Sequence, residues 1–178
     1  MKDTLGRKLL EWRILKVVPH LRGRLLDIGC GTNRLVAAYR GEGIGVDVFP
    51  WEGVDLVVKN TADLPYDDGE FDTVSIIASL NHIPNREDVL VEAYRVLNNE
   101  GRIIITMIPP IISRIWHKLR EPWDVDQTKR GMVEGEVFGI SNSDIIRLLN
   151  SSGFETVHQS TFMMGINHLN VARKVPLS

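Results

Sequence analysis

The sequence predicts a doubly wound α/β fold, in which helices cover both faces of a mostly parallel sheet. One indication is Leu25–Ile28, an apolar strand candidate that runs into a turn containing Gly29 and Gly31 and then into a helix. A strand, a glycine-rich turn and a helix in that order form a nucleotide-binding crossover. Residues 72–78 and 102–108 form two further apolar runs, as expected for central parallel strands buried on both faces.

Size and composition indicate a single globular domain over residues 1–178, with 43% hydrophobic and 25% charged residues. The net charge of −2 gives no general attraction to nucleic acid or to an anionic membrane, so we expect neither partner. The one cysteine, Cys30, cannot form an internal disulfide and fits a reducing compartment, so we expect a cytoplasmic protein. No apolar run approaches the roughly 20 residues of a membrane span.

Residues 4–18 have the apolar spacing of an amphipathic helix, which makes residues 1–20 an N-terminal helical segment closed by Pro19. The second and third strands are predicted at residues 44–48 and 54–58. A parallel crossover normally needs a dozen or more residues, and the link between these two strands is far shorter. We therefore expect no helix there and a thin sheet edge.

The second half begins with a predicted helix at residues 86–97, for which Asn85 is the expected N-cap. A later helix, at residues 143–151, follows Ser141, with Asp144 three residues after that serine in a variant of the capping box. Gly153 is expected to end this helix.

The segment between these helices, residues 109–139, has no clean period and contains two of the four tryptophans. Unpatterned segments of this length are uncommon in compact domains and are often lids or binding loops. We therefore predict a lid or acceptor-binding insertion here.

Five short motifs follow one another between residues 25 and 108. They are Asp27-Ile28-Gly29-Cys30-Gly31-Thr32, Gly45-Val46-Asp47, Ala62-Asp63-Leu64-Pro65-Tyr66, Phe71-Asp72 and His82-Ile83-Pro84. In this set the chain resembles the class I S-adenosylmethionine-dependent methyltransferases, and it looks most like the type 11 methyltransferase domain family. The resemblance implies a Rossmann-like sheet whose closing strands, at residues 154–162 and 168–173, form an antiparallel hairpin.

The resemblance also implies S-adenosylmethionine as cofactor, S-adenosylhomocysteine as product and a small molecule as methyl acceptor. This cofactor carries no phosphate, so the glycine-rich turn would cradle its amino-acid end. The expected cofactor-binding set is Asp27, Gly29, Cys30, Gly31, Asp47, Val48, Asp63, Leu64, Ser79 and Leu80.

Several members of this set have an individual expected role. Asp47 lies 20 residues after Asp27, the spacing at which an acid reaches ribose hydroxyls, although a solvated turn acid is the alternative. Asp27 would lie beneath the turn, where it either orders the turn amides or takes the ammonium group of the cofactor. Between two turn glycines, Cys30 is expected to be a small packing residue rather than a nucleophile.

By resemblance, Asp63 would accept from the adenine amino group, with the Leu64 amide nearby. Ser79 and Leu80 match the position that lines the methionine side of the cofactor. Many relatives have two histidines after the fourth strand, and here the chain reads Asn81-His82.

His82 is therefore the catalytic candidate, either as a general base or as a structural histidine that holds its loop. The acceptor-binding candidates lie in the unpatterned segment and are Trp116, His117 and Trp123. No spacing of histidines and acids suggests a metal site.

Three other functions compete with this one. A dinucleotide-dependent dehydrogenase would need a third glycine, and Arg34 occupies that position. A non-catalytic member could keep cofactor binding without turnover. Enzymes that methylate base amines usually have Asn or Asp, then Pro-Pro and an aromatic residue after the fourth strand, where this chain reads Ser79-Leu80-Asn81-His82.

Overall fold

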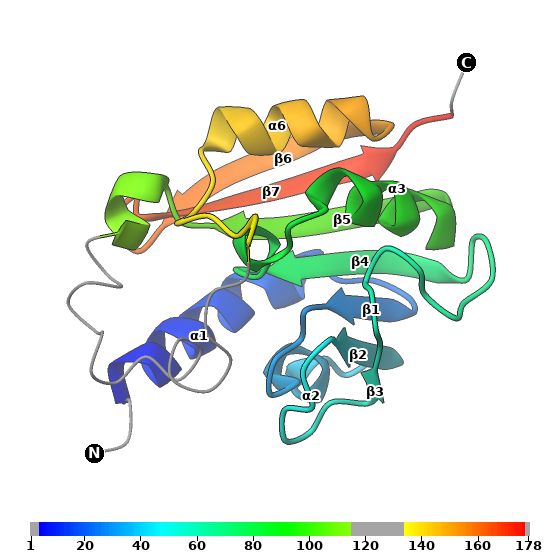
Figure 1. Cartoon of the computed structure of the whole chain (residues 1–178), viewed down its shortest axis with the longest axis horizontal. Coiled ribbons are helices and arrows are strands. Elements are labelled where there is room, and N and C mark those ends of the chain that lie inside the picture. The colour runs from blue at the N-terminus through cyan, green and yellow to red at the C-terminus, as the bar shows by residue number, and fades with distance from the viewer. Residues whose placement is uncertain (1–3, 115–133, 177–178) are drawn as a thin grey trace.

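The computed structural model describes residues 4–114 and 134–176. Seven strands form one sheet in the order β3-β2-β1-β4-β5-β7-β6 (Figure 1). Strands β1 to β5 pair in parallel, while β7 is antiparallel to both β5 and β6. The bounds are β1 Leu25–Ile28, β2 Gly43–Asp47, β3 Leu56–Val57, β4 Phe71–Ile77, β5 Leu97–Met107, β6 Phe154–Phe162 and β7 Asn167–Lys174. The predicted α/β fold and its antiparallel closing pair are confirmed.

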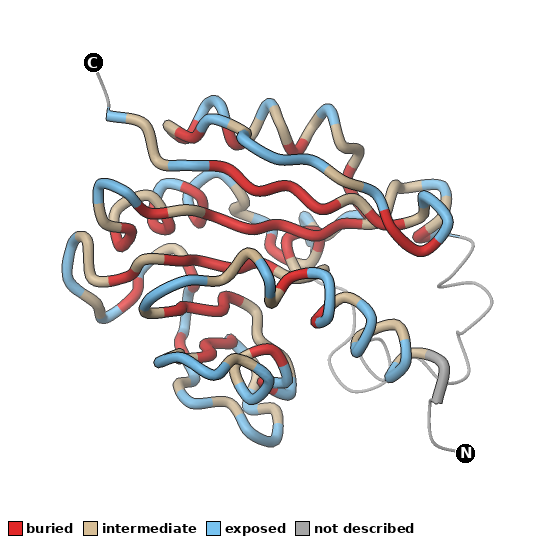
Figure 2. Tube along the Cα trace, turned by 180° about the vertical axis from the view of Figure 1, so that it is seen from behind, coloured by how far each residue is buried: buried red, intermediate tan, exposed pale blue. Residues whose placement is uncertain are grey.

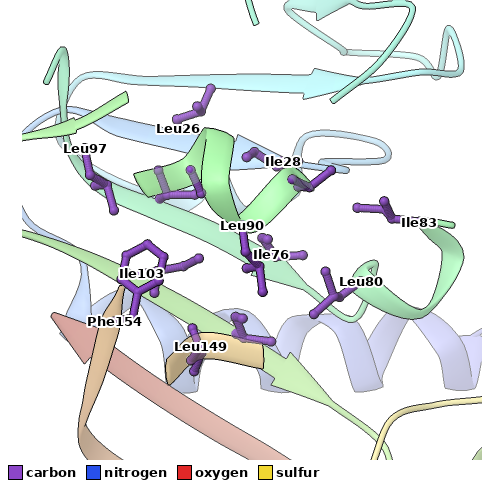
Figure 3. Close-up of a cluster of buried hydrophobic side chains, with 14 of the residues drawn as sticks. Leu26, Ile28, Ile76, Leu80, Ile83, Leu90, Leu97, Ile103, Leu149 and Phe154 are labelled. Carbon is purple, nitrogen blue, oxygen red and sulfur yellow. The ribbon is translucent and has the colours of Figure 1, made fainter. Parts of the chain in front are cut away.

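Helices cover both faces of the sheet, and each face has its own apolar core. On one face α3 (Arg86–Val96) packs against β5 and α6 (Asn142–Ser151) packs against β6, and Figure 3 shows Leu90, Leu149 and Ile103 in the core cluster that they share. On the other face α1 (Thr4–Val17) and α2 (Arg34–Ala38) pack against the opposite side chains of the same strands. Figure 2 shows the resulting burial pattern: the central strands are buried and the outer sides of the helices are exposed.

The β2–β3 edge is thin, as the short link predicts. Strand β3 has only two residues and pairs in parallel with β2 through Val46 and Leu56. Asp55, in the link, accepts hydrogen bonds from the Gly45 amide and the Asn33 side chain, each at 2.8 Å. A carboxylate thus stabilises a connection that lacks a helix.

Some predicted boundaries are wrong by a few residues. Pro19 lies within a 3₁₀ turn, η1 (Val18–His20), that continues from α1, because proline is compatible with the first turn of a helix. Leu97 does not end α3 but starts β5, where it pairs with Phe71. Asn85 is the N-cap residue of α3, as predicted, but its side chain makes no cap bond and its Nδ2 donates to Asn60 Oδ1 instead.

The predicted cap of α6 is confirmed. The Asp144 amide donates to the Ser141 hydroxyl over 3.2 Å, and that hydroxyl donates to the Asp144 carboxylate over 2.6 Å. Gly153 follows the helix with a φ of +83°, a backbone conformation that glycine adopts without strain.

Candidate functional site

A cavity of about 540 Å³ lies at the carboxyl ends of β1, β2 and β4, bounded on one side by α1. In parallel α/β sheets this edge is where ligands bind. Seven predicted site residues line the cavity: Asp27, Gly29, Cys30, Gly31, Asp47, Val48, Ser79, together with His82. A second hollow, of about 630 Å³, lies between the starts of α3 and α6, and none of the predicted site residues is in its lining.

The glycine-rich turn is held by backbone hydrogen bonds to β2. The amides of Gly29 and Cys30 both donate to the Val46 carbonyl, at 2.8 and 3.1 Å. Gly29 has a φ of +70°, and a β-carbon there would lie 2.7 Å from the Ser79 side chain. At Gly31, with a φ of +54°, no atom lies within 4 Å of a β-carbon position. The turn therefore packs tightly against Ser79 at Gly29 and leaves open space at Gly31.

Asp47 orders the turn, a role that was one of the two alternatives predicted for Asp27. Asp47 Oδ2 accepts from the Gly31 amide and Oδ1 accepts from the Phe49 amide, each at 2.9 Å. Its carboxylate is buried and also lines the cavity. Each carboxylate oxygen has two lone-pair directions, so the group can accept from a ligand as well.

Asp27 bonds to no turn amide in the described residues, and its Oδ1 accepts from the Ser75 hydroxyl at 2.6 Å. Burial raises the pKa of this carboxyl to about 7, and the Asp47 carboxylate adds to that effect while the Ser75 bond opposes it. A cation beside Asp27 would favour the charged form. Of the two roles that the sequence leaves open, the ammonium role fits this geometry.

Cys30 remains a thiol. Burial raises the pKa of its sulfur far above the usual value, and the nearby carboxylates of Asp27, Asp47 and Asp55 raise it further. A thiol nucleophile needs a lowered pKa, so this environment agrees with the predicted packing role.

Three members of the predicted cofactor set do not line the cavity. Asp63 is exposed on the segment after β3, and Leu64 is buried in the core. The Leu64 amide donates to Glu92 Oε1 at 2.8 Å, which corrects the expectation that this amide serves adenine. Leu80 points into the core cluster of Figure 3, so only its neighbour Ser79 faces the ligand side.

Other lining residues were not found from the sequence. They come from α1, from the β2–β3 link and from the segment before Asp63: Gly6, Arg7, Leu10, Glu11, Arg13, Ile14, Trp51 and Thr61. The amphipathic pattern of α1 predicts its buried face but not that its polar side closes a cavity. Thr61, two residues before Asp63, reaches the cavity that Asp63 was expected to reach.

His82 lies at the end of η2 (Leu80–His82), directly after β4, as predicted. Its ring Nδ1 lies 3.2 Å from Oε2 of Glu136, a carboxylate in the segment before α6. The Glu136 side chain is 1% exposed and the His82 side chain 26%. The acceptor-binding candidates Trp116, His117 and Trp123 lie outside the described residues.

No group of three histidine, cysteine or acidic side chains could hold a metal ion in residues 4–114 and 134–176. Over the same residues, no helix is both long and apolar enough to cross a membrane.

Comparison with known proteins agrees with this geometry. The methyltransferase domain family of type 11 matches residues 26–105. The ubiquinone/menaquinone biosynthesis C-methyltransferase of Rickettsia typhi is 24% identical over 98% of this chain and 87% of its own. The PH0226 protein of Pyrococcus horikoshii superposes with a TM-score of 0.74 at 20% identity, over 97% and 93% of the two chains.

A further solved structure contains ligands. The 1,6-didemethyltoxoflavin-N1-methyltransferase of Burkholderia thailandensis, with 1,6-didemethyltoxoflavin and S-adenosylhomocysteine bound, has a TM-score of 0.69 and 18% identity over 96% of this chain and 83% of its own. The motifs, the sheet and these matches define a class I methyltransferase. More specifically, residues 26–105 match the type 11 methyltransferase domain, and the matches support an S-adenosylmethionine-dependent methyltransferase. The dehydrogenase alternative does not hold, because the family model and these relatives are methyltransferases.

Proposed function

We propose that the enzyme transfers the methyl group to a small-molecule acceptor bound in the same cavity as the cofactor. The observation that carries this proposal is the cavity itself. Its volume of about 540 Å³ is within the range of small-molecule sites, roughly 300–1,000 Å³. It contains both the glycine-rich turn and His82, so donor and acceptor would share one space.

Charge in the cavity supports a small molecule over nucleic acid. Among the described lining residues, Arg7, Arg13 and Arg34 are matched by Glu11, Asp27 and Asp47. A surface that follows a phosphate backbone needs an excess of cations. We propose a cytoplasmic location, because the chain's one cysteine, Cys30, has no second cysteine to pair with and fits a reducing compartment.

The chain's residues fit the cofactor. Open space over Gly31 admits a ligand against the turn, where a side chain would otherwise lie. Asp27 would hold the ammonium group, and Asp47 would accept from the ribose hydroxyls with its remaining lone pairs. Thr61 and Trp51 line the same cavity and would lie near the base. We keep Asp63 only as a candidate for adenine, to be tested by substitution.

The chemistry then depends on positioning. When bound, the cofactor supplies a methyl group already activated by a sulfonium. The turn and Asp47 fix the donor, while α1 closes the cavity and restricts water. Holding two reactants in line contributes several kcal/mol, up to about 7–11 kcal/mol in the best cases. His82 lies where it could take a proton from an acceptor.

We propose that residues 1–178 form a single domain. Within it, the insertion at residues 109–139 would select the methyl acceptor. Both described ends of the insertion approach the site's surroundings. Pro110 and Arg114 line the neighbouring hollow with Val137 and Phe138, and Val137 bonds to Asn81 beside His82.

A methyl-transfer screen tests the proposal. Purified enzyme with S-adenosylmethionine is incubated with quinols, nitrogen heterocycles, amines and carboxylic acids, and release of S-adenosylhomocysteine is measured. Ring compounds are tested first, because the relatives are named for ubiquinone, menaquinone and 1,6-didemethyltoxoflavin, which all contain rings. We expect one class to raise product release above the acceptor-free rate, and the Asp47→Ala variant to lose that increase. Release that rises only with DNA or RNA would contradict the proposal.

A further inference from the structure

We propose that Glu136 positions His82, and that the two form a carboxylate–imidazole pair that takes the acceptor's proton during methyl transfer. This inference rests on the proposed function, because it needs an acceptor in the cavity beside His82. Glu136 would be a positioning residue, acting through the imidazole rather than touching the acceptor.

The pair joins parts of the chain that are far apart in sequence. His82 ends η2 after β4, whereas Glu136 is 54 residues later in the segment that precedes α6. Their contact distance of 3.2 Å is a hydrogen bond. A carboxylate can only accept, so Nδ1 of the neutral ring carries the hydrogen and proton uptake falls to Nε2.

Burial makes the position of Glu136 costly unless the carboxylate is paired. Its side chain is only 1% exposed, although its backbone lies near the surface. A charged group taken from water requires compensating partners. One is the His82 ring. The other is the Arg86 guanidinium, whose pKa is lowered by burial while the Glu136 carboxylate opposes that change.

Attachment of the segment does not require this buried acid. The Val137 amide donates to the Asn81 carbonyl over 3.0 Å, and the Asn81 side chain donates to the Val137 carbonyl over 3.2 Å. Arg86 donates to the Gly135 carbonyl over 2.6 Å. Hydrogen bonds on both sides of Glu136 already tie the segment to Asn81 of η2 and to Arg86 of α3. A charge at the one position that faces an imidazole in the cavity therefore indicates a role in proton handling.

Methyl transfer releases one proton from the acceptor, and His82 would accept it. An O–H, N–H or C–H acceptor forms a bond to the methyl carbon as the carbon–sulfur bond breaks, and the electron pair of that bond stays on sulfur. One proton leaves the acceptor and binds His82 Nε2. The Glu136 carboxylate, hydrogen-bonded at Nδ1, stabilises the imidazolium that results.

Other charged groups line the same cavity and must be considered in any pH dependence. They are Arg7, Glu11, Arg13, Asp27, Arg34 and Asp47, and Arg86 lies behind the segment. A substitution at Glu136 leaves the six cavity groups in place and removes the negative charge that acts on Arg86.

The test is a nitrogen NMR titration of the histidine rings in the whole protein, with and without S-adenosylhomocysteine. His82→Gln identifies the His82 signals by their loss. In the wild type we expect neutral His82 to carry its hydrogen on Nδ1. In Glu136→Gln the carboxamide can either accept from or donate to Nδ1, so the preference for a hydrogen on Nδ1 should be weakened or lost. The matched control, Glu134→Gln on the exposed neighbouring acid, should keep that preference.

Kinetics separate proton handling from loop attachment. Once an acceptor is known, Glu136→Gln should reduce kcat by 10-fold or more and move the acidic limb of its pH profile to lower pH. Its melting temperature and S-adenosylhomocysteine affinity should match the wild type. A loop-attachment role predicts a lower melting temperature with the acidic limb unmoved, and that result would overturn the proposal.

The NMR result stands without turnover. A hydrogen on Nε2 of neutral His82 in the wild type, or a tautomer preference that is the same in Glu136→Gln, would overturn the pair even if methyl transfer occurs. Conversely, absence of S-adenosylhomocysteine binding to the wild type would contradict the proposed function, whereas the ring signals of the free protein would still report on the pair. The wild-type measurement also keeps the test decisive if Glu136→Gln does not fold.

Discussion

The two sides of the cavity are built in different ways. On the cofactor side, the turn at Gly29 and Gly31 is held by β2, whose Val46 and Asp47 lie within 18 residues of it. On the acceptor side, His82 is held by Glu136, 54 residues away, and Asn81 by Val137, 56 residues away. The cofactor side is thus built from adjacent strands, with β2 holding the turn and with Ser75 of β4 and Ser79 just after β4 lying beneath it, whereas the acceptor side depends on the segment before α6.

This difference has a functional meaning. A cofactor site that is complete within adjacent strands can stay the same while the acceptor side changes with the insertion. Substitutions on the cofactor side should therefore alter affinity for S-adenosylhomocysteine or the stability of the whole fold. Substitutions on the acceptor side should alter turnover and leave that affinity unchanged.

The largest expected effect is at Asp27. Its folded-state pKa is about 7 against an ordinary value of 3.8, so between these two values the unfolded chain loses a proton that the folded protein keeps. Stability therefore falls as pH rises from about 4 to 7 and is level above that. Asp27→Asn keeps an acceptor for Ser75, and we expect it to be more stable than the wild type by about 4 kcal/mol at pH 8.

Chemical denaturation at pH 4 and pH 8 checks this. The two proteins should be nearly equal in stability at pH 4 and diverge towards pH 8, while Asp27→Asn binds S-adenosylmethionine more weakly because the ammonium partner is neutral. Equal stabilities at pH 8 would mean that the buried carboxyl is not destabilising.

The next largest effect is expected on stability, from substitutions at Gly29 and Gly31. Gly29→Ala combines a left-handed backbone with a β-carbon 2.7 Å from Ser79, so we expect a loss of about 3 kcal/mol in stability. Gly31→Ala has a similar backbone strain but open space around the added carbon, so its cost should be about 1 kcal/mol.

The double variant Gly29→Ala with Ser79→Gly checks the cause. Removing the Ser79 side chain should restore part of the stability that Gly29→Ala loses. If denaturant midpoints show equal losses for the two single variants, the contact with Ser79 is not the reason for the glycine.

Asp47→Ala should weaken S-adenosylhomocysteine binding by about 1.5–3 kcal/mol, since it removes charge-assisted bonds to ribose and leaves the Gly31 amide without its acceptor. Calorimetric titration measures this loss. Asp63→Ala is the informative companion, because Asp63 is exposed and away from the cavity lining. An unchanged affinity in Asp63→Ala would remove Asp63 from the adenine site, and a comparable loss would restore it.

The smallest effect is expected on the acceptor side. Asn81→Ala removes one side-chain hydrogen bond to Val137 while keeping the backbone bond between the same residues, so stability should fall by about 0.5–1.5 kcal/mol. Turnover should fall because the segment that carries Glu136 is held less firmly. Thermal unfolding and the acceptor-dependent rate report the two changes separately.

Sequence reasoning predicted the cofactor side well because its signals are local. The strand, the turn and an acid 20 residues after Asp27 are readable in one short stretch, and the structure brings them to one cavity. Which acid orders the turn was not readable. Both Asp27 and Asp47 follow the pattern, and only the hydrogen bond between Asp47 and Gly31 distinguishes them.

The acceptor side could not be predicted in this way. Glu136 lies in an unpatterned segment, and nothing in its neighbours indicates that a tertiary contact buries its side chain beside His82. The Leu64 amide was misassigned for a related reason, because its partner Glu92 comes from α3. Pairings between distant segments depend on packing, which composition and spacing do not encode locally.

The most direct test of the separation is calorimetric titration of S-adenosylhomocysteine into three proteins: the wild type, Asp47→Ala and Glu136→Gln. If the cofactor side is complete in itself, the wild type and Glu136→Gln should bind with the same affinity and Asp47→Ala should bind at least 10-fold more weakly. Equal weakening in Glu136→Gln and Asp47→Ala would contradict the account, because it would mean that the two sides of the cavity form one inseparable site.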